Sequence, residues 1–187
     1  QCVFSDKEIT QYHKMFNYSY EEIQQVIKTL AENGQEATGS MGDDTPMAVL
    51  SSQTRTLYDY FRQQFAQVTN PPIDPLRERY VMSLGTCIGR EHNVFNETLG
   101  HADRISFSTP ILMYTGLKQL RDLDPEHYRS DTLSLNYKAD EGLEAAVIRL
   151  CDEAQELVRN HRTVILILSD RAITPGLLVV PAAMAVG

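Results

Sequence analysis

The sequence contains few cysteines, and they do not cluster. Cys2, Cys87 and Cys151 are far apart and odd in number, and no CxxC pair or Cys/His cluster occurs. The sequence therefore predicts neither a disulfide framework nor a zinc site. A reduced, cytoplasmic setting is the simplest interpretation.

Positive charge is also scarce. The chain has 17 Lys and Arg against 25 Asp and Glu, a formal net charge of −8, and its basic residues are scattered. Nucleic acids and anionic membrane surfaces require a concentrated positive field, so neither is an expected partner. No apolar run approaches the roughly 20 residues that span a bilayer.

The familiar patterns of catalytic and ligand-binding sites are incomplete. The histidines lack HxxxH or HExxH spacing. An N-terminal cysteine amidohydrolase uses the amine of its own cysteine as base, but Gln1 precedes Cys2. The loop Gly39–Pro46 could cradle a phosphate, or hold a cation at Asp43 and Asp44. Without a P-loop lysine or a third oxygen donor, a turn held by its own side chains is favoured.

The length and composition are those of a globular protein. The chain has 187 residues, of which 42% are hydrophobic and 22% are charged, as in one domain or a large piece of one. It begins at Gln1 and closes on the apolar run Leu177–Gly187. We therefore expect a piece of a longer protein, in which other residues bury that run.

The first 34 residues have the pattern of a helical connector. Ser5 with Glu8, and Ser19 with Glu22, have the spacing of capping boxes, and Gly34 supplies a left-handed stop. Each box starts a short helix. The residues expected to face inward on the second helix are Ile23, Val26, Ile27 and Leu30.

The middle of the chain is less regular. Met47–Leu50 is interpreted as an edge strand or a buried loop, and a helix is expected from Thr56 to Gln67. The turn Thr69–Pro72 ends that helix, because residues before proline avoid helical geometry. Asp74 and Pro75 start another helix, which is expected to reach the glycines at Gly85 and Gly89.

The next segment is weakly patterned. We interpret Arg90–Pro110 as a long loop and Ile111–Tyr114 as a short buried segment. Thr115 is then expected to cap a helix that ends near Leu123.

The last third predicts a parallel βαβ unit. Thr132–Ala139 alternates like a half-buried strand, Asp140 caps a long helix, and Thr163–Leu168 is a continuous apolar run typical of a strand covered on both faces. The predicted fold class is α/β, with a partial, incomplete barrel-like parallel sheet. The expected inward face of the long helix is Leu143, Val147, Leu150, Cys151, Ala154, Leu157 and Val158.

The carboxyl end of the last strand carries Ser169, Asp170 and Arg171. Ligands bind at this edge of open sheets and barrels. Asp170 and Arg171 could orient a polar substrate, as in a stand-alone α/β enzyme or ligand-binding module, or they could form an internal ion pair. The internal ion pair is the favoured interpretation.

Four runs of sequence resemble one family in the right order: GSMGDDTPMAVLS, DYFRQQFAQVTNPPIDPLRE, SLGTCIGRE and VILILSDR. They are similar to the central domain of the glutamate synthase large subunit, with the bacterial NADPH-dependent form as the nearest type and the glutaminase-fused ferredoxin form as the alternative. The resemblance assigns residues 1–34 to a helical connector and residues 35–187 to the first part of that α/β domain.

The resemblance implies a role without chemistry of its own. The family makes two L-glutamates from L-glutamine and 2-oxoglutarate, with an amidotransferase domain, a synthase domain that holds FMN and an iron–sulfur cluster, and NADPH supplied through a small (beta) subunit. The central domain links the two catalytic domains and walls part of an ammonia channel. The family's catalytic, flavin and cluster residues fall outside this chain, so Cys2 inherits no role.

The resemblance also suggests which residues wall the channel. Ammonia is small and neutral, and water would protonate it, so rigid walls with few ionised groups suit its passage. The proline-rich turn after the third predicted helix and the glycine-rich loop before it are the candidates. The positions carried over are Thr69, Asn70, Pro71, Gly42 and Asp43.

Overall fold

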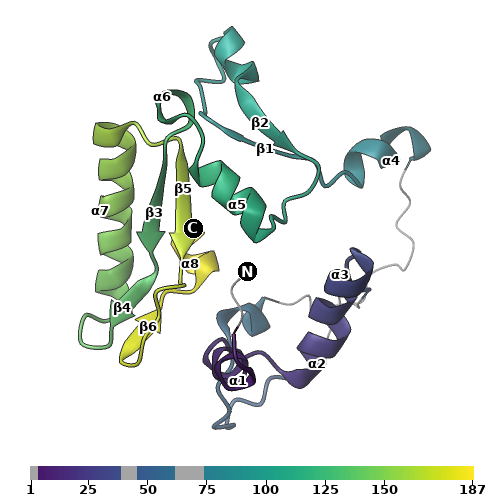
Figure 1. Ribbon diagram of the computed structural model, residues 1–187, viewed down its shortest axis with the longest axis vertical. Coiled ribbons are helices and arrows are strands. Elements are labelled where there is room, and N and C mark those ends of the chain that lie inside the picture. Colours follow the sequence, from purple (N-terminus) through teal and green to yellow (C-terminus); the bar gives the residue numbers. More distant parts are fainter. Residues whose placement is uncertain (1–3, 39–45, 62–73) are drawn as a thin grey trace. The chain divides into compact units, whose positions relative to one another are not determined.

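The computed structural model describes residues 4–38, 46–61 and 74–187 (Figure 1). The chain divides between Pro72 and Ile73 into two compact units. The connector boundary expected after Gly34 stays a prediction. None of the helices in the described ranges has both the length and the apolar character needed to cross a membrane.

Both predicted capping boxes are confirmed in the first unit. The Glu8 carboxylate accepts from the Ser5 amide at 2.8 Å, and the Ser5 hydroxyl accepts from the Glu8 amide at 3.4 Å. Ser19 and Glu22 repeat the arrangement, and Gly34 ends the last helix with φ 62°. The elements are α1 (Asp6–Met15), α2 (Tyr20–Glu22), the π-helical η1 (Ile23–Ile27) and α3 (Lys28–Asn33).

The prediction that the apolar face of the second helix is buried is wrong. No residue from α1 to α3 is buried. Val26, Ile27 and Leu30 are 51%, 41% and 38% exposed. The helical periodicity identified the apolar stripe, but periodicity cannot show what packs against it.

The segment 46–61 differs from both expectations for it. Met47–Leu50 is neither strand nor buried, and Leu50 is 97% exposed. The described part of the helix predicted from Thr56 is a single 3-10 turn, η2 (Leu57–Tyr60), at whose start the Asp59 carboxylate accepts from the Thr56 amide. The rest of that predicted helix lies outside the described residues.

The second unit begins with a short helix and a β-hairpin. Asp74 caps α4 (Pro75–Val81) as predicted, but the helix ends before the predicted glycines. The hairpin, β1 (Thr86–Gly89) with β2 (Arg104–Phe107), corrects the prediction of a continuous loop over 90–110. Gly89 permits it, because a Cβ there would lie 3.0 Å from the Asp103 carbonyl oxygen.

The connection from the hairpin to the sheet is helical. The predicted buried segment Ile111–Tyr114 is wrong, since Met113 is 77% exposed. Helix α5 begins one residue before Thr115, with Met113 as its N-cap. The elements of this connection are α5 (Tyr114–Arg121) and α6 (Pro125–Tyr128), whereas η3 (Leu99–Ala102) lies between β1 and β2.

The predicted parallel βαβ unit and α/β class are confirmed. Strand β3 (Ser130–Ser134) pairs in parallel with β5 (Ile165–Ser169), and α7 (Leu143–His161) connects them. Figure 1 shows α7 on one side of the β3–β5 pair and α5 on the other side of the pair. No closed barrel is formed by the strands that the structure describes.

The strand predicted over 132–139 is split into two. Its second part, β4 (Asn136–Lys138), pairs antiparallel with β6 (Leu177–Val179), which α8 (Ala182–Val186) follows. Leu135 joins the two sheets: its amide donates to the Ser169 carbonyl and its carbonyl accepts from the Val180 amide, each at 2.9 Å. One residue thus terminates one ladder and begins the other.

The core lies between α7 and the two strand pairs. Its buried members are Leu133, Leu135, Ala146, Leu150 and Val180.

The inward face predicted for α7 is partly wrong. Leu150 is buried, but Cys151 is exposed and Val158 is 50% exposed. The fully buried Ala146 sets the true inward face, from which Cys151 and Val158 are rotated. The helix starts after Gly142, at φ 78°, and not at Asp140.

Candidate functional site

The carboxyl edge of the parallel pair brings two serines together. Ser134 and Ser169 are partners in the β3–β5 register. Each hydroxyl accepts a backbone amide two residues further on, from Asn136 at 3.3 Å and from Arg171 at 3.4 Å. These bonds form turns of the kind that end strands.

Arg171 has a partner that the sequence did not suggest. Its guanidinium lies over the Tyr114 ring of α5, 5.6 Å from the ring centroid, as in a cation–π contact. The favoured ion pair between Asp170 and Arg171 is not formed within the described part of the chain. A ligand site at Asp170 and Arg171 stays a prediction.

The opposite edge of the pair holds a clamp made of one buried and two partly exposed side chains. The Asp131 carboxylate on β3 accepts from the hydroxyl of Thr163, which is 6% exposed, and from Nε of Arg129 at 3.0 Å. The Thr163 bond, assisted by Arg129, lowers the pKa of Asp131. The clamp ties the end of the α7–β5 connection to the start of β3.

Replacing Asp131 by Asn should weaken this clamp. A carboxylate whose pKa is lowered by folding stabilises the protein above its unfolded pKa of about 3.9, and this contribution disappears as pH falls through the folded pKa. We expect Asp131→Asn to cost about 1–2 kcal/mol at pH 7 and almost nothing at pH 2. Urea unfolding at both pH values measures the difference. Asp152→Asn, on the exposed side of α7, is the control, and equal losses for the two variants would contradict the clamp.

A second contact fastens the hairpin to the connection that follows it. The Tyr128 hydroxyl at the end of α6 donates to the Asp103 carboxylate, just before β2. This bond raises the pKa of Tyr128. On the same helix, Asp124 caps the Glu126 amide at 3.0 Å and pairs with His127 at 2.8 Å, which raises the pKa of His127.

Removing the Tyr128 hydroxyl should loosen the hairpin. With Tyr128→Phe we expect amide hydrogen exchange in Thr86–Gly89 and Arg104–Phe107 to become about 2- to 10-fold faster, because one hydrogen bond to a charged group is lost. Mass spectrometry of peptides covering both strands provides the rates. Tyr80→Phe, on the exposed surface of α4, should leave them unchanged. Unchanged exchange in Tyr128→Phe would show that Asp103 does not hold the hairpin.

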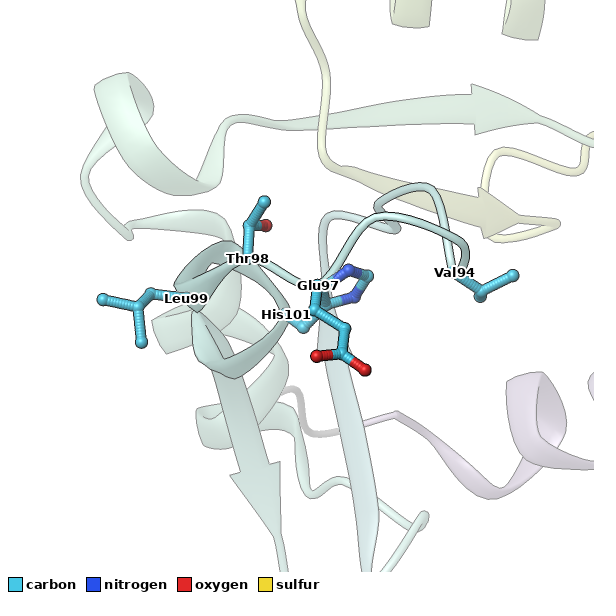
Figure 2. Close-up of a pocket in the computed structure, with 5 residues that line it drawn as sticks. All are labelled: Val94, Glu97, Thr98, Leu99 and His101. Carbon is cyan, nitrogen blue, oxygen red and sulfur yellow. The ribbon is translucent and has the colours of Figure 1, made fainter.

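A shallow open hollow of about 600 Å³ lies on the connection between β1 and β2 (Figure 2). In Figure 2 the side chains of Val94 and Leu99 point outward on either side, with Glu97 and His101 between them. The His101 ring is 5.4 Å from that of His92. The residues that line the hollow are Val94, Glu97, Thr98, Leu99 and His101.

Three of the five histidines have hydrogen-bond partners in the described ranges. His101 Nε2 bonds the Asn96 carbonyl at 2.9 Å, His127 bonds Asp124, and His161 lies 3.4 Å from Arg129. No group of three His, Cys, Asp or Glu side chains in the described ranges is placed as metal ligands would be. The two cysteines in those ranges, Cys87 and Cys151, are both exposed.

The residues predicted to wall a channel cannot be placed. Thr69, Asn70, Pro71, Gly42 and Asp43 all lie outside the described residues, and so does Cys2. Sequence reasoning also missed the hollow. Its one available signal was the trio Val94, Phe95 and Leu99 within an otherwise polar stretch.

Comparison with known proteins decides the family. The family model "Glutamate synthase central domain" matches residues 11–187. The chain belongs to the glutamate synthase central domain family. The resemblance seen in the four sequence runs is thereby confirmed.

The relatives of this glutamate synthase central domain are much longer proteins. It is 42% identical to "Ferredoxin-dependent glutamate synthase, chloroplastic" of Oryza sativa subsp. japonica, covering 96% of this chain and 11% of that protein. It is 38% identical to "Glutamate synthase [NADPH] large chain" of Azospirillum brasilense, covering 96% and 12%. It is 40% identical to "Glutamate synthase [NADH]" of Schizosaccharomyces pombe, covering 83% and 8%. The chain thus spans about a tenth of these relatives, and the identities do not separate the three electron donors.

Proposed function

We propose that this chain acts as the non-catalytic central domain of a glutamate synthase large subunit. The observation that supports this is the family match over residues 11–187. The full protein converts L-glutamine, 2-oxoglutarate and a reduced electron donor into two L-glutamates. One glutamate is the deamidated glutamine, and the other is 2-oxoglutarate after it gains ammonia and two electrons.

In this proposal the chain joins two catalytic domains of the same polypeptide. The amidotransferase domain releases ammonia from glutamine, and the synthase domain forms and reduces 2-iminoglutarate. In this proposal FMN and the iron–sulfur cluster belong to the synthase domain. Reduced FMN, when bound there, would supply the hydride for the imine.

We place the ammonia channel wall at Thr69, Asn70, Pro71, Gly42 and Asp43. The consecutive prolines Pro71 and Pro72 predict a rigid turn, because each proline ring fixes its own φ. Rigidity keeps a passage open for ammonia and closed to water, which would trap ammonia as ammonium. The wall residues hold shape and exclude water, and they take part in no bond making.

For the remaining assignments we keep the bacterial NADPH-dependent type, in which NADPH reaches the synthase domain through a small (beta) subunit, and a cytoplasmic location. The scattered basic residues and the net charge of −8 favour these protein partners over nucleic acid or an anionic membrane surface.

The experiment is a donor comparison with the full-length protein. Glutamate formation from glutamine and 2-oxoglutarate is measured with NADPH, NADH and reduced ferredoxin in turn. We expect synthesis that depends on 2-oxoglutarate and is fastest with NADPH. Absence of synthesis with all three donors would contradict the proposed function, and a preference for ferredoxin or NADH would correct the donor alone.

A further inference from the structure

Three apolar side chains stand out from the connection between β1 and β2. Val94, Phe95 and Leu99 are 75%, 95% and 94% exposed. We call residues 94–99 the apolar tip. Single exposed apolar residues are ordinary, whereas three of them within six residues can form a patch of the kind that another protein part covers.

The backbone of the tip is held in place by its own hydrogen bonds. The Phe95 amide donates to the Asn93 side chain at 3.0 Å, and the Asn96 amide donates to the Asn93 carbonyl at 2.9 Å. His101 Nε2 bonds the Asn96 carbonyl at 2.9 Å. A segment ordered in advance loses little conformational entropy when it binds, so its apolar contacts can count toward affinity.

The base of the tip is also fixed. The His92 ring packs so closely on Gly100 that a Cβ there would lie 2.9 Å from Nε2. Nearby, Arg104 donates to the Glu91 carboxylate at 2.8 Å, which lowers the pKa of Glu91. These contacts connect the residues that follow β1 to Gly100 and to Arg104 of β2.

Between the exposed apolar groups lies the open hollow with Glu97 (Figure 2). Within the described ranges Glu97 forms no ion pair, unlike Glu91. An apolar pair flanking a carboxylate that has no ion-pair partner in the described ranges fits a partner surface with an apolar depression and a cationic side chain at its rim.

We propose that the apolar tip docks into another domain of the same glutamate synthase polypeptide, with Phe95 and Leu99 as its anchors and a Lys or Arg of that domain facing Glu97. This inference rests on the proposed function. The relatives carry this sequence as 8% to 12% of their length, so most of each polypeptide is available to cover the tip. Covalent linkage supplies a high effective concentration, so a contact of this small size suffices.

Cysteine labelling of the full-length protein tests whether the tip is covered. The variants are Phe95→Cys, Leu99→Cys and, as a control on the exposed side of α7, Gln155→Cys. The maleimide reaction is followed at each site by mass spectrometry, in native buffer and in urea. We expect labelling at positions 95 and 99 to be at least about 10-fold slower in native buffer than in urea, since a docked side chain reacts only when the contact opens. Native rates within about 2-fold of the urea rates, with the control also reacting freely, would overturn the proposal.

Photo-crosslinking identifies what covers the tip. Phe95→p-benzoylphenylalanine keeps an aromatic anchor in place, and irradiation should join it to a peptide outside residues 1–187 of the same polypeptide. The yield should not depend on protein concentration. Crosslinks only between two copies, only within residues 1–187, or none at all would overturn the proposal.

The donor comparison separates this failure from failure of the proposed function. Normal glutamate synthesis by a protein with a freely labelled Phe95→Cys would refute the docking contact and leave the proposed function standing. Absence of synthesis in the wild-type protein would refute the proposed function itself.

Discussion

Replacing Thr69 by Trp in the full-length protein should uncouple glutamine hydrolysis from glutamate synthesis. A bulky ring in the wall of a narrow passage blocks ammonia, while the amidotransferase site is untouched. Ammonia then escapes to water and is protonated. We expect the glutamate formed per glutamine consumed to fall from about two to about one, and 2-oxoglutarate consumption to fall nearly to zero.

The matched control is Thr69→Ser, which keeps the hydroxyl group and reduces the volume. It should retain normal stoichiometry. An unchanged ratio in Thr69→Trp would remove Thr69 from the channel wall. A loss of glutaminase activity in both variants would instead indicate a role for this turn in the structure of the amidotransferase site.

Truncating Leu135 should produce the largest loss of stability in the second unit. This side chain is 2% exposed, and its backbone joins the β3–β5 and β4–β6 ladders. Leu135→Ala removes buried apolar volume and leaves a cavity, for which the usual cost is about 2–5 kcal/mol. Hydrogen exchange of α7 peptides in increasing urea measures the free energy of local unfolding.

Leu178→Ala is the comparison for this variant. Leu178 is 47% exposed on β6, and its truncation should cost less than about 1 kcal/mol. Equal losses for the two variants would show that the core does not depend on Leu135. A loss confined to β6 and absent from α7 would contradict the inference that Leu135 joins the two ladders.

Local sequence signals predicted the elements that local chemistry determines. Each capping box needs only residues three apart, so Ser5 with Glu8 and Ser19 with Glu22 could be read directly. The parallel unit of β3, α7 and β5 was predictable because a continuous apolar run after a long amphipathic helix has few other solutions.

Features that depend on distant partners were missed. The strands β1 and β2 have four residues each, too few for a periodic pattern, and they are stable only as a pair. The division of the predicted strand at Leu135 depends on bonds to Ser169 and Val180, which lie far along the chain. The exposure of Cys151 follows from a rotation of α7 that Ala146, a residue with weak hydrophobic signal, determines.

The candidate sites also differ in whether they depend on local sequence or on distant partners. The stacking of Arg171 on Tyr114 joins two segments whose proximity only the fold shows. The apolar residues of the tip can be read from the sequence VFNETL. Because the segment was interpreted as a loop, its ordered backbone was not predicted. The channel residues rest on the resemblance alone, and their test is functional.

The measurement that tests the central claim most directly is an activity assay of residues 1–187 alone, beside the full-length protein. We expect the shorter chain to resist trypsin over 73–187, to have no flavin absorbance and to hydrolyse no glutamine, while the full-length protein makes glutamate. Glutamine hydrolysis by residues 1–187, abolished by iodoacetamide at Cys2, would contradict the assignment of this chain as a domain without chemistry of its own.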